Sequence, residues 1–388
     1  MATVTRKWLK TDLEKNTNKY WGFTAEELPN GLLNVKFGWG RVKENGDYSG
    51  VRVKVISKSE LESKILEQET KDGYVEIDYG QSAVLDYNGK TVSDISGRVA
   101  TLVQLLMEQA NRSIYKYLNA SLDSISLRVL NSADDILSLM DKNGVTAELL
   151  QSFYQTIPTK LPARIYIQEL MREFDISEQR NRIAQMRGAV KYNNRSGQSL
   201  VDLIGAEIEE VSPHEDDYKW VVKKSNERDP NDPVNHKIVV TDVYRVRIPE
   251  ERKSFTETGI GNVTRLFHGT SIGNVAHILR GGLKTEHSRY GLFGKGIYGA
   301  DYMGKSCIYT DRISNAPNLM LVCDFALGNQ MIASGEMTRI DKSPNGYDSV
   351  FAKKGHTNYN GRKVHQNEFI VYKNNQVTVT HIVVGRWQ

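Results

Sequence analysis

The residues between 266 and 310 combine the side chains that a binding site for a flat ligand needs. His268 is followed by Gly269, and Tyr298 and Tyr309 stand eleven residues apart. Glycine lets a backbone approach a ligand closely, and tyrosine offers an aromatic face with a hydroxyl group. The set suits a planar aromatic group that bears a carboxamide, because the N–H and C=O of Gly269 can pair in the plane of a primary amide.

A single acid far downstream completes the candidate site. Glu368 precedes the apolar run 369–371, which is typical of a strand. A carboxylate at a strand edge can stabilise an oxocarbenium-like transition state and orient a nucleophilic hydroxyl. Ser306 and Tyr309 are spaced i, i+3, so on a helix they share one face. Taken singly, each of these residues also fits a structural or solvated role.

Length and composition describe an ordinary multidomain globular protein. The chain has 388 residues, of which 39% are hydrophobic and 25% charged, so two or three domains with buried cores are expected. The net charge of +4 is too small to indicate nucleic-acid binding without local clustering. We expect no membrane span or signal peptide. The two cysteines, Cys307 and Cys323, indicate a reducing intracellular compartment.

Two regions precede the candidate site. Up to about residue 80, alternation in 32–37 and 51–55 predicts strands, and residues 59–69 predict a helix. From about residue 92 to 195, helical periodicity predicts an all-α bundle. In this bundle Asp94 is expected to cap the first helix, Gly144 to end another, and further helices are expected at 147–157 and 163–186.

The third region follows a predicted linker at 192–197 and mixes strands with helices. Strands are predicted at 237–248, 319–325, 369–372 and 377–384, and helices at 272–280 and 303–310. The fold class is therefore multidomain, with a small α+β region, an all-α bundle and a mixed α/β region in that order.

Several segments of the third region keep a particular order and spacing. They are His268-Gly269-Thr270 with Asn274, 293–298, Ala300-Asp301, Lys305-Ser306 with Tyr309, 326–329, 348–350 and 367–372. This set resembles the catalytic domain of poly(ADP-ribose) polymerases. The resemblance covers about 190 residues, and no Rossmann or Walker glycine motif competes with it. It implies an ADP-ribosyltransferase domain with antiparallel-rich split sheets.

The resemblance implies that NAD⁺ is the substrate, split at its nicotinamide–ribose bond, and that neither a cofactor nor a metal is needed. It implies a catalytic triad of His268, Tyr298 and Glu368. Lys305 would assist near Glu368. His268 would hold the adenosine-side ribose, and Tyr298 would flank the nicotinamide. The residues that would bind the substrate are Gly269, Thr270, Asn274, Ser306 and Tyr309.

Some of these roles are more specific. The Gly269 backbone and the Ser306 hydroxyl would grip the carboxamide, while Tyr309 would stack on the nicotinamide ring. Glu368 would polarise the ribose and support attack by the acceptor. A glutamate at this position resembles the chain-elongating members of the family, whereas members that transfer one unit commonly lack it.

Four features depart from the family's pattern. Thr270 stands in place of the more usual serine, and Gly299 stands where many relatives carry an aromatic residue. The segment 285–290 looks short, which affects the expected adenosine contacts. The stretch 351–366 also looks short, which affects acceptor specificity and chain length.

The first region contains Trp39-Gly40-Arg41, with Tyr20-Trp21 before it and 76–80 after it. This order resembles a WGR domain and implies DNA with a strand break or a 5′ phosphate as partner. A tryptophan ring can stack on an end base, and an arginine can bind a phosphate in two places. An amphipathic strand with snorkelling cations is the alternative. The predicted DNA-binding residues are Trp39, Arg41, Lys36, Lys43, Arg52 and Lys54.

The helical region, in particular 152–158, resembles the regulatory domain of DNA-dependent members of the family. It implies autoinhibition, in which the helices block NAD⁺ until DNA binding shifts the population. The predicted domains are 1–85 (WGR), 90–196 (helical regulatory) and 198–388 (ADP-ribosyltransferase).

The sequence thus predicts an ADP-ribosyltransferase of the DNA damage response that builds polymer on itself and on other proteins. One alternative is a mono-ADP-ribosyltransferase with a DNA-binding module. Another is a DNA-binding module with an inactive transferase fold, which the intact His-Tyr-Glu set disfavours. The expected location is intracellular: cytoplasm or nucleoid in a bacterial or viral setting, nucleus in a eukaryotic one.

Overall fold

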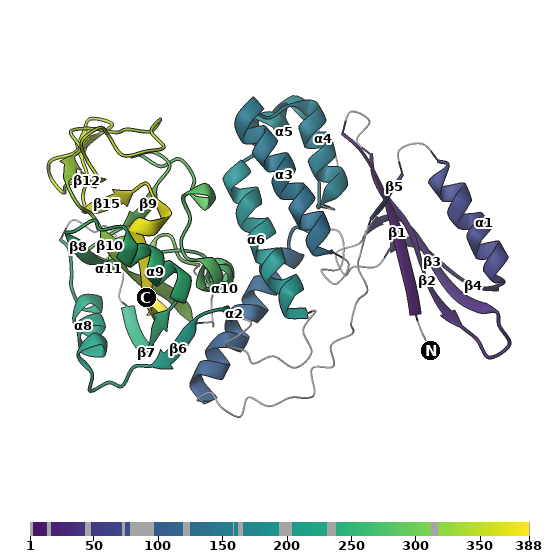
Figure 1. Cartoon of the computed structure of the whole chain (residues 1–388), viewed down its shortest axis with the longest axis horizontal. Coiled ribbons are helices and arrows are strands. Elements are labelled where there is room, and N and C mark those ends of the chain that lie inside the picture. The colour runs from purple at the N-terminus through teal and green to yellow at the C-terminus, as the bar shows by residue number, and fades with distance from the viewer. Residues whose placement is uncertain are drawn as a thin grey trace. The chain divides into compact units, whose positions relative to one another are not determined.

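The computed structural model divides into two compact units. Their helices and strands are labelled in Figure 1. One unit comprises Met1–Tyr87 with Asn111–Arg195, and the other comprises Asn88–Ala110 with Ser196–Gln388. Helix α2 (Gly97–Tyr115) therefore belongs to both units. The structure describes residues 3–13, 17–42, 48–71, 74–77, 97–118, 125–157, 159–161, 166–193, 204–230, 238–311 and 317–387.

The first unit contains an antiparallel sheet in the strand order β4-β3-β2-β1-β5. Its strands are β1 (Thr3–Asp12), β2 (Thr17–Glu27), β3 (Leu33–Val42), β4 (Tyr48–Ile56) and β5 (Val75–Ile77). Strands β3 and β4 confirm the two strands that alternation predicts. Helix α1 (Lys58–Glu69) begins after Ser57, whose side chain accepts a hydrogen bond from the N–H of Glu60, and it lies along the sheet (Figure 1).

The two faces of this sheet differ in a way that alternation alone does not show. Val35 and Phe37 of β3 are buried in the core between the sheet and α1. In the register of β3 with β4, Val35 faces Lys54 and Phe37 faces Arg52, so both cations stand on the core side of the edge strand. Their stems can lie beside the core while their charges reach water. The residues of β4 on the opposite, exposed face are Val51, Val53 and Val55.

Helices occupy the predicted helical region. They are α2, α3 (Leu127–Asn143), α4 (Ala147–Thr156), α5 (Ile167–Glu173) and α6 (Ile176–Asn193). Ser126 and Thr146 cap the N-termini of α3 and α4, and Gly144 ends α3 with a φ of 82°, as predicted. Leu130 and Phe153 are among the buried residues of their shared core.

Two boundaries in this region differ from the prediction. The helix expected over 163–186 is replaced by α5 and α6, because Asp175 accepts a hydrogen bond from the N–H of Glu178 and starts a new helix. Helix α6 also continues to Asn193, into the segment interpreted as a linker, since polar composition alone does not end a helix. Asp94 lies outside the described residues.

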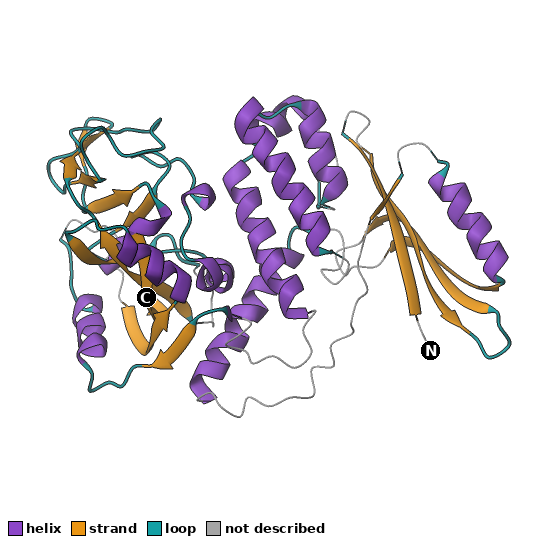
Figure 2. Ribbon diagram, in the orientation of Figure 1, coloured by secondary structure: helices purple, strands orange, loops and turns teal. Residues whose placement is uncertain are grey.

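The second unit contains two sheets, with the strand orders β6-β7-β16-β10-β8 and β11-β12-β15-β9. The first consists of β6 (Glu207–Glu210), β7 (Ile238–Arg247), β8 (Val263–His268), β10 (Asn318–Ala326) and β16 (Val377–Trp387). The second consists of β9 (Ile297–Gly299), β11 (Gln330–Ile332), β12 (Ser349–Ala352) and β15 (Glu368–Val371). Helices and loops accompany both sheets (Figure 2), which confirms a mixed α/β fold.

Short helices complete this unit: α8 (Asp216–Ser225), α9 (Pro249–Glu257), α10 (Ile272–Gly281), α11 (Met303–Cys307), η2 (Thr285–His287) and η3 (Asn374–Gln376). Helix α11 is shorter than the predicted 303–310, because the chain continues from Cys307 in turns with i→i+3 hydrogen bonds. A small hairpin of β13 (Asn358–Tyr359) and β14 (Arg362–Lys363) lies within 351–366. Among the described helices, none is long and apolar enough to cross a membrane.

Candidate active site

The end of strand β8 brings His268 beside strand β9. Backbone hydrogen bonds of 2.8 and 3.0 Å join Phe267 to Ala300. Nδ1 of His268 lies 2.8 Å from the carbonyl oxygen of Tyr298. Because a carbonyl oxygen only accepts, Nδ1 carries the proton and Nε2 is left as an acceptor. Burial lowers the pKa of His268, so the ring is neutral near neutral pH and can accept a hydrogen bond from a hydroxyl.

Gly269 lies so close to α11 that a side chain does not fit. A Cβ atom at this position would stand 1.9 Å from the carbonyl oxygen of Ser306 and 3.1 Å from Cβ of Tyr309. The buried hydroxyl of Ser306 donates to the carbonyl oxygen of Phe267 at 3.0 Å. The structure therefore brings Gly269, Ser306 and Tyr309 together. In this arrangement the Ser306 hydroxyl oxygen can accept a bond from an amide, and it can donate to one only after it rotates.

The hydroxyl of Tyr298 is engaged by the turn that precedes it. It accepts a hydrogen bond from the N–H of Phe293 at 3.0 Å and donates to the carbonyl oxygen of Gly294 at 2.8 Å. Burial raises the pKa of Tyr298 well above its ordinary value, the bond from Phe293 opposes this, and the nearby Glu368 adds to it. The hydroxyl thus positions the turn, which leaves the aromatic ring as the part that can face a ligand.

Glu368, the first residue of β15, forms an ion pair with Lys305 of α11. The Nζ–Oε1 distance is 3.1 Å, and the side chains are only 18% and 9% exposed. Burial alone would lower the pKa of Lys305, but the charge of Glu368 and the contact with Tyr309 raise it. A pair this deeply buried needs good geometry to be tolerated, so Lys305 determines the direction of the Glu368 carboxylate.

Tyr309 presents an open aromatic surface next to this ion pair. Its side chain is 56% exposed, and Nζ of Lys305 lies 5.6 Å from its ring centroid. The distance is within the range of a cation–π contact. An exposed ring held beside a buried charged pair is available for stacking on a flat ligand.

Two departures from the family's pattern have local explanations. The hydroxyl of Thr270 accepts a hydrogen bond from the Asn274 side chain at 3.1 Å, which a serine hydroxyl would also do. A Cβ atom on Gly299 would lie 2.8 Å from the ring of Phe325 and 3.0 Å from Leu266. The Phe325 ring therefore fills the space beside β9, and a larger residue at position 299 would require the Phe325 and Leu266 side chains to shift.

Residues that the sequence left without a role support the site from a distance. Asp311 accepts hydrogen bonds of 2.7 Å from the hydroxyl of Ser271 and the N–H of Ile272, and so caps α10. Asn374 accepts a bond of 2.8 Å from the N–H of Thr285 and thereby anchors η2, within the segment 285–290. These partners are 39 and 89 residues apart in the chain, so no local pattern reveals them.

The residues predicted to bind DNA lie on two faces of the first sheet. Trp39 is 42% exposed, and its ring packs directly over Gly50. Arg52 and Lys54 share the face of Trp39. Lys36 is opposite Val53 in the register and therefore belongs to the other face. Lys43 and the side chain of Arg41 lie outside the described residues.

Comparison with known proteins gives a family match for part of the chain. Residues 215–386 match the poly(ADP-ribose) polymerase catalytic domain family. Over these residues the chain is similar to the catalytic domain of PARP-family ADP-ribosyltransferases. The match leaves the sheet of the first unit and the helical region without a family assignment, so their interpretation stays a prediction.

Relatives that resemble the chain over most of its length differ in their reported activities. One is protein mono-ADP-ribosyltransferase PARP4 of Homo sapiens, 27% identical over 315 residues, or 75% of this chain and 18% of the relative. Another is poly [ADP-ribose] polymerase 1 of Danio rerio, which is 22% identical over 435 residues. The aligned part covers 98% of this chain and 43% of the relative. A third is protein mono-ADP-ribosyltransferase PARP3 of Homo sapiens, which is 22% identical over 410 residues. The aligned part covers 90% of this chain and 76% of the relative. The chain thus spans less than a fifth of the length of human PARP4.

Proposed function

We propose that the chain transfers ADP-ribose from NAD⁺, builds poly(ADP-ribose) on itself and on other proteins, releases nicotinamide, and is stimulated by DNA breaks. The observation that carries the chemistry is the buried ion pair of Lys305 with Glu368, next to the exposed ring of Tyr309. The match of residues 215–386 to the catalytic domain supports the reaction class.

In the proposed reaction, the bond between ribose C1′ and the nicotinamide nitrogen breaks, and its electron pair leaves with neutral nicotinamide. An acceptor hydroxyl forms the new bond to C1′ and passes its proton to Glu368 or to water. Glu368 accepts a hydrogen bond from the ribose and stabilises the positive charge that develops on the sugar. Lys305 keeps the carboxylate in the required direction through the 3.1 Å ion pair.

The other residues of the site hold the substrate. The bare Nε2 of His268 accepts a hydrogen bond from the adenosine-side ribose, because Nδ1 is bound to Tyr298. The ring of Tyr309 stacks on the nicotinamide. The backbone of Gly269 pairs with the carboxamide, at the position where a larger residue would collide with Ser306. Holding the leaving group and the ribose in one geometry lowers the entropic part of the barrier.

Transfer of a single unit is the second candidate function. Two of the relatives named above, PARP4 and PARP3 of Homo sapiens, are mono-ADP-ribosyltransferases, which supports it. Polymer formation is supported by Glu368, which occupies the position where chain-elongating members carry a glutamate. It is also supported by the similarity to poly [ADP-ribose] polymerase 1 of Danio rerio, which extends over 98% of the present chain.

Stimulation by DNA would involve the first sheet and helix α2. Trp39, Arg52 and Lys54 share one face of the first sheet, where stacking and phosphate contacts could both form. The helical region would restrict NAD⁺ until DNA shifts the population. Helix α2 belongs to both units, and Arg98 in its first turn forms ion pairs with Glu210 and Asp242. A movement of α2 would therefore reach the strands of the catalytic unit.

Incubation with labelled NAD⁺, with and without a nicked duplex that carries a 5′ phosphate, tests the proposal. Release of nicotinamide and labelling of the protein are the expected results, with stronger labelling when DNA is present. A smear on a denaturing gel indicates polymer, whereas a sharp shift indicates a single unit and the second candidate. Equal labelling with and without DNA would rule out stimulation, and no nicotinamide release in either arm would rule out the enzyme.

A further inference from the structure

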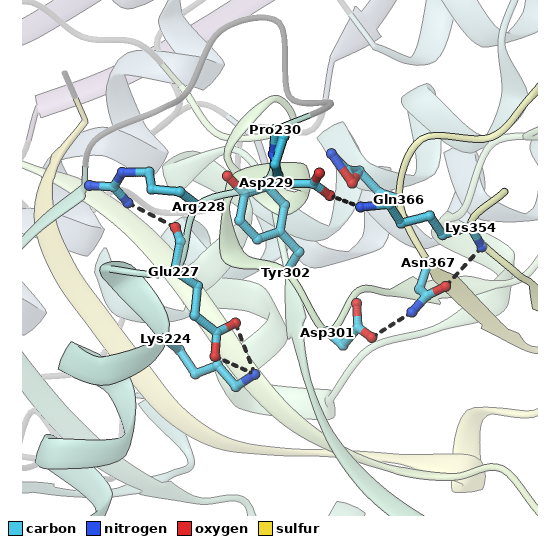
Figure 3. Close-up of a pocket in the computed structure, with 10 residues that line it drawn as sticks. All are labelled: Lys224, Glu227, Arg228, Asp229, Pro230, Asp301, Tyr302, Lys354, Gln366 and Asn367. Atoms are coloured by element: carbon cyan, nitrogen blue, oxygen red, sulfur yellow. Dashed lines mark hydrogen bonds and ion pairs between the residues drawn. The ribbon is translucent and has the colours of Figure 1, made fainter.

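Asn367 stands immediately before Glu368, and its side chain is committed at both ends. Its Nδ2 donates to Oδ2 of Asp301 at 2.8 Å, and its Oδ1 accepts from the backbone N–H of Lys354 at 2.9 Å (Figure 3). An ionised carboxylate only accepts and a backbone N–H only donates. The Asn367 amide therefore has a single orientation that satisfies both partners.

The hydrogen bond between Asn367 and Asp301 lies just beyond the point where the backbone pairing of β15 with β9 ends. Strand β15 pairs with β9 from Phe369, which is opposite Gly299, onward. Glu368 therefore lies one residue before the paired part on this side. If the register is continued by two residues, Asn367 stands opposite Asp301, so their side-chain bond closes the open end of β15 at the catalytic glutamate.

Lys354 links the Asn367 side chain to a further acidic residue, Asp229. Its backbone binds Asn367, while its Nζ forms an ion pair of 2.6 Å with Asp229, whose side chain is only 10% exposed. These residues line a polar cavity of about 350 Å³ (Figure 3). Within it, Lys224 and Glu227 also pair with each other at 2.9 Å. The third cation of the lining, Arg228, donates to the backbone carbonyl oxygens of Ser225 and Glu227. Because all three cations have partners in the protein, we interpret this lining as a structural hydrogen-bonded network and not as a ligand site.

We infer that Asn367 is a positioning residue for Glu368. The inference rests on the proposed function, because it concerns the carboxylate that the reaction uses. Asn367 acts through the backbone: its bonds to Asp301 and Lys354 hold β15 between β9 and β12, so that Glu368 meets Lys305. Without these bonds the carboxylate would have a range of positions, and a displacement of about 1 Å is enough to cost roughly a hundredfold in rate.

A swap of the two side chains tests this inference. In Asn367→Asp, two carboxylates face each other and the bond to residue 301 is lost, while the bond from Lys354 remains possible. In Asp301→Asn, an amide oxygen still accepts from Asn367. In the double variant, the amide of residue 301 donates to the carboxylate of residue 367, so both hydrogen bonds return with one direction reversed.

We expect kcat for nicotinamide release to fall about 10- to 100-fold in Asn367→Asp, with little change in KM for NAD⁺. Asp301→Asn should lose less, and the double variant should recover most of the loss. Lys224→Met, which removes the more exposed pair with Glu227 elsewhere in the same cavity, is the matched control and should leave kcat unchanged. A double variant as slow as Asn367→Asp, or an unimpaired Asn367→Asp, would overturn the inference.

A second measurement separates this inference from the proposed function. Crystal structures of the variants give the distance between Lys305 and Glu368, which is 3.1 Å here. We expect it to lengthen in Asn367→Asp and to return in the double variant, whether or not the protein turns over NAD⁺. A wild-type protein without nicotinamide release would refute the proposed function. An unchanged distance in Asn367→Asp would refute the positioning role.

Discussion

The carbonyl oxygen of Tyr298 decides which nitrogen of His268 carries the proton. In the same way, the carbonyl oxygen of Phe267 accepts the hydrogen bond that the Ser306 hydroxyl donates, and Lys305 pairs with the carboxylate of Glu368. At the scale of single residues, these partners decide which polar atoms stay available to a ligand: Nε2 of His268, the hydroxyl oxygen of Ser306 as an acceptor, and the unpaired oxygen of Glu368. Groups that are held in this way need little reorganisation when a ligand binds.

Glu368→Gln should abolish polymer while a slow release of nicotinamide survives. Glutamine keeps the shape of the side chain but lacks the charge that stabilises the sugar cation and pairs with Lys305. The products are separated on a denaturing gel, and nicotinamide is quantified by chromatography. Thermal unfolding of the variant controls for the stability lost with the ion pair. Polymer at the wild-type level would contradict the role assigned to Glu368.

Gly269→Ala should destabilise the catalytic unit by about 1–3 kcal/mol and abolish detectable turnover, because the added Cβ overpacks the site. It would stand 1.9 Å from the Ser306 carbonyl oxygen, which is backbone and cannot swing aside. Gly261→Ala is the matched control, since a Cβ there meets nothing within 4 Å. Urea unfolding and nicotinamide release measure both effects. A Gly269→Ala variant as stable and active as Gly261→Ala would contradict this packing.

At the scale of elements, the site depends on connections between short helices and strands. Asp311 caps α10 from beyond α11, and Asn374 of η3 anchors η2. Helix α10 and η2 also meet through His277 and His287, whose ring centroids are 5.5 Å apart. Nδ1 of His277 is buried without a hydrogen-bond partner among the described residues. This junction should therefore respond to pH.

Acidification should weaken the contact of α10 with η2. Burial, and to a lesser extent the neighbouring His287, lowers the pKa of His277 from 6.5 to about 3. Below about pH 6.5 the His277 side chain is therefore protonated in the unfolded chain but stays neutral in the folded chain. Because the unfolded state binds more protons, the free energy of unfolding falls as the pH falls through this range. At about pH 5.5 the loss from this group is about 1 kcal/mol.

His277→Gln isolates this contribution from the other titrating groups. The midpoint of urea unfolding is compared for both proteins at about pH 7.5 and pH 5.5. We expect the variant to lose less stability on acidification than the wild type, because glutamine does not titrate in this range. Equal losses in the two proteins would show that His277 is not kept neutral by the fold.

At the scale of the whole molecule, two compact units share helix α2, and the candidate chemistry belongs entirely to one of them. The ion pairs of Arg98 connect the first turn of α2 to β6 and β7. Such exposed pairs add little to stability, so they can exchange at low energetic cost.

The two faces of the first sheet should differ in their effect on DNA stimulation. Trp39→Ala and Arg52→Ala should each raise the DNA concentration needed for half-maximal stimulation about tenfold, because stacking and phosphate contacts are lost. Lys36→Ala, on the opposite face, should change it less than about twofold. Titration of a 5′-phosphorylated nicked duplex, with nicotinamide release as readout, measures this. Equal effects of Lys36→Ala and Arg52→Ala would contradict binding through the Trp39 face.

The sequence by itself indicated the resemblance of the third region to an ADP-ribosyltransferase domain, and it also indicated much of the local structure of the regions before it. The order of His268, Tyr298 and Glu368 indicated the chemistry, because motif residues and their spacing are written along the chain. Helix ends such as Gly144 were also predictable, since a cap is local. Alternation located strands β3 and β4 equally well, because side-chain direction has a period of two.

Only the tertiary structure decided which face of β4 is buried and which partners hold Glu368. Alternation is symmetric between two faces, and α1 breaks that symmetry by covering the side of Val35 and Phe37. Likewise the motif segments contain Asp301 and Asn367, but only the sheet shows that these two residues bind each other and that Lys354 joins them, across 66 and 13 positions of sequence. Contacts of that kind depend on chain topology, and the residues themselves carry no local signal of their partners.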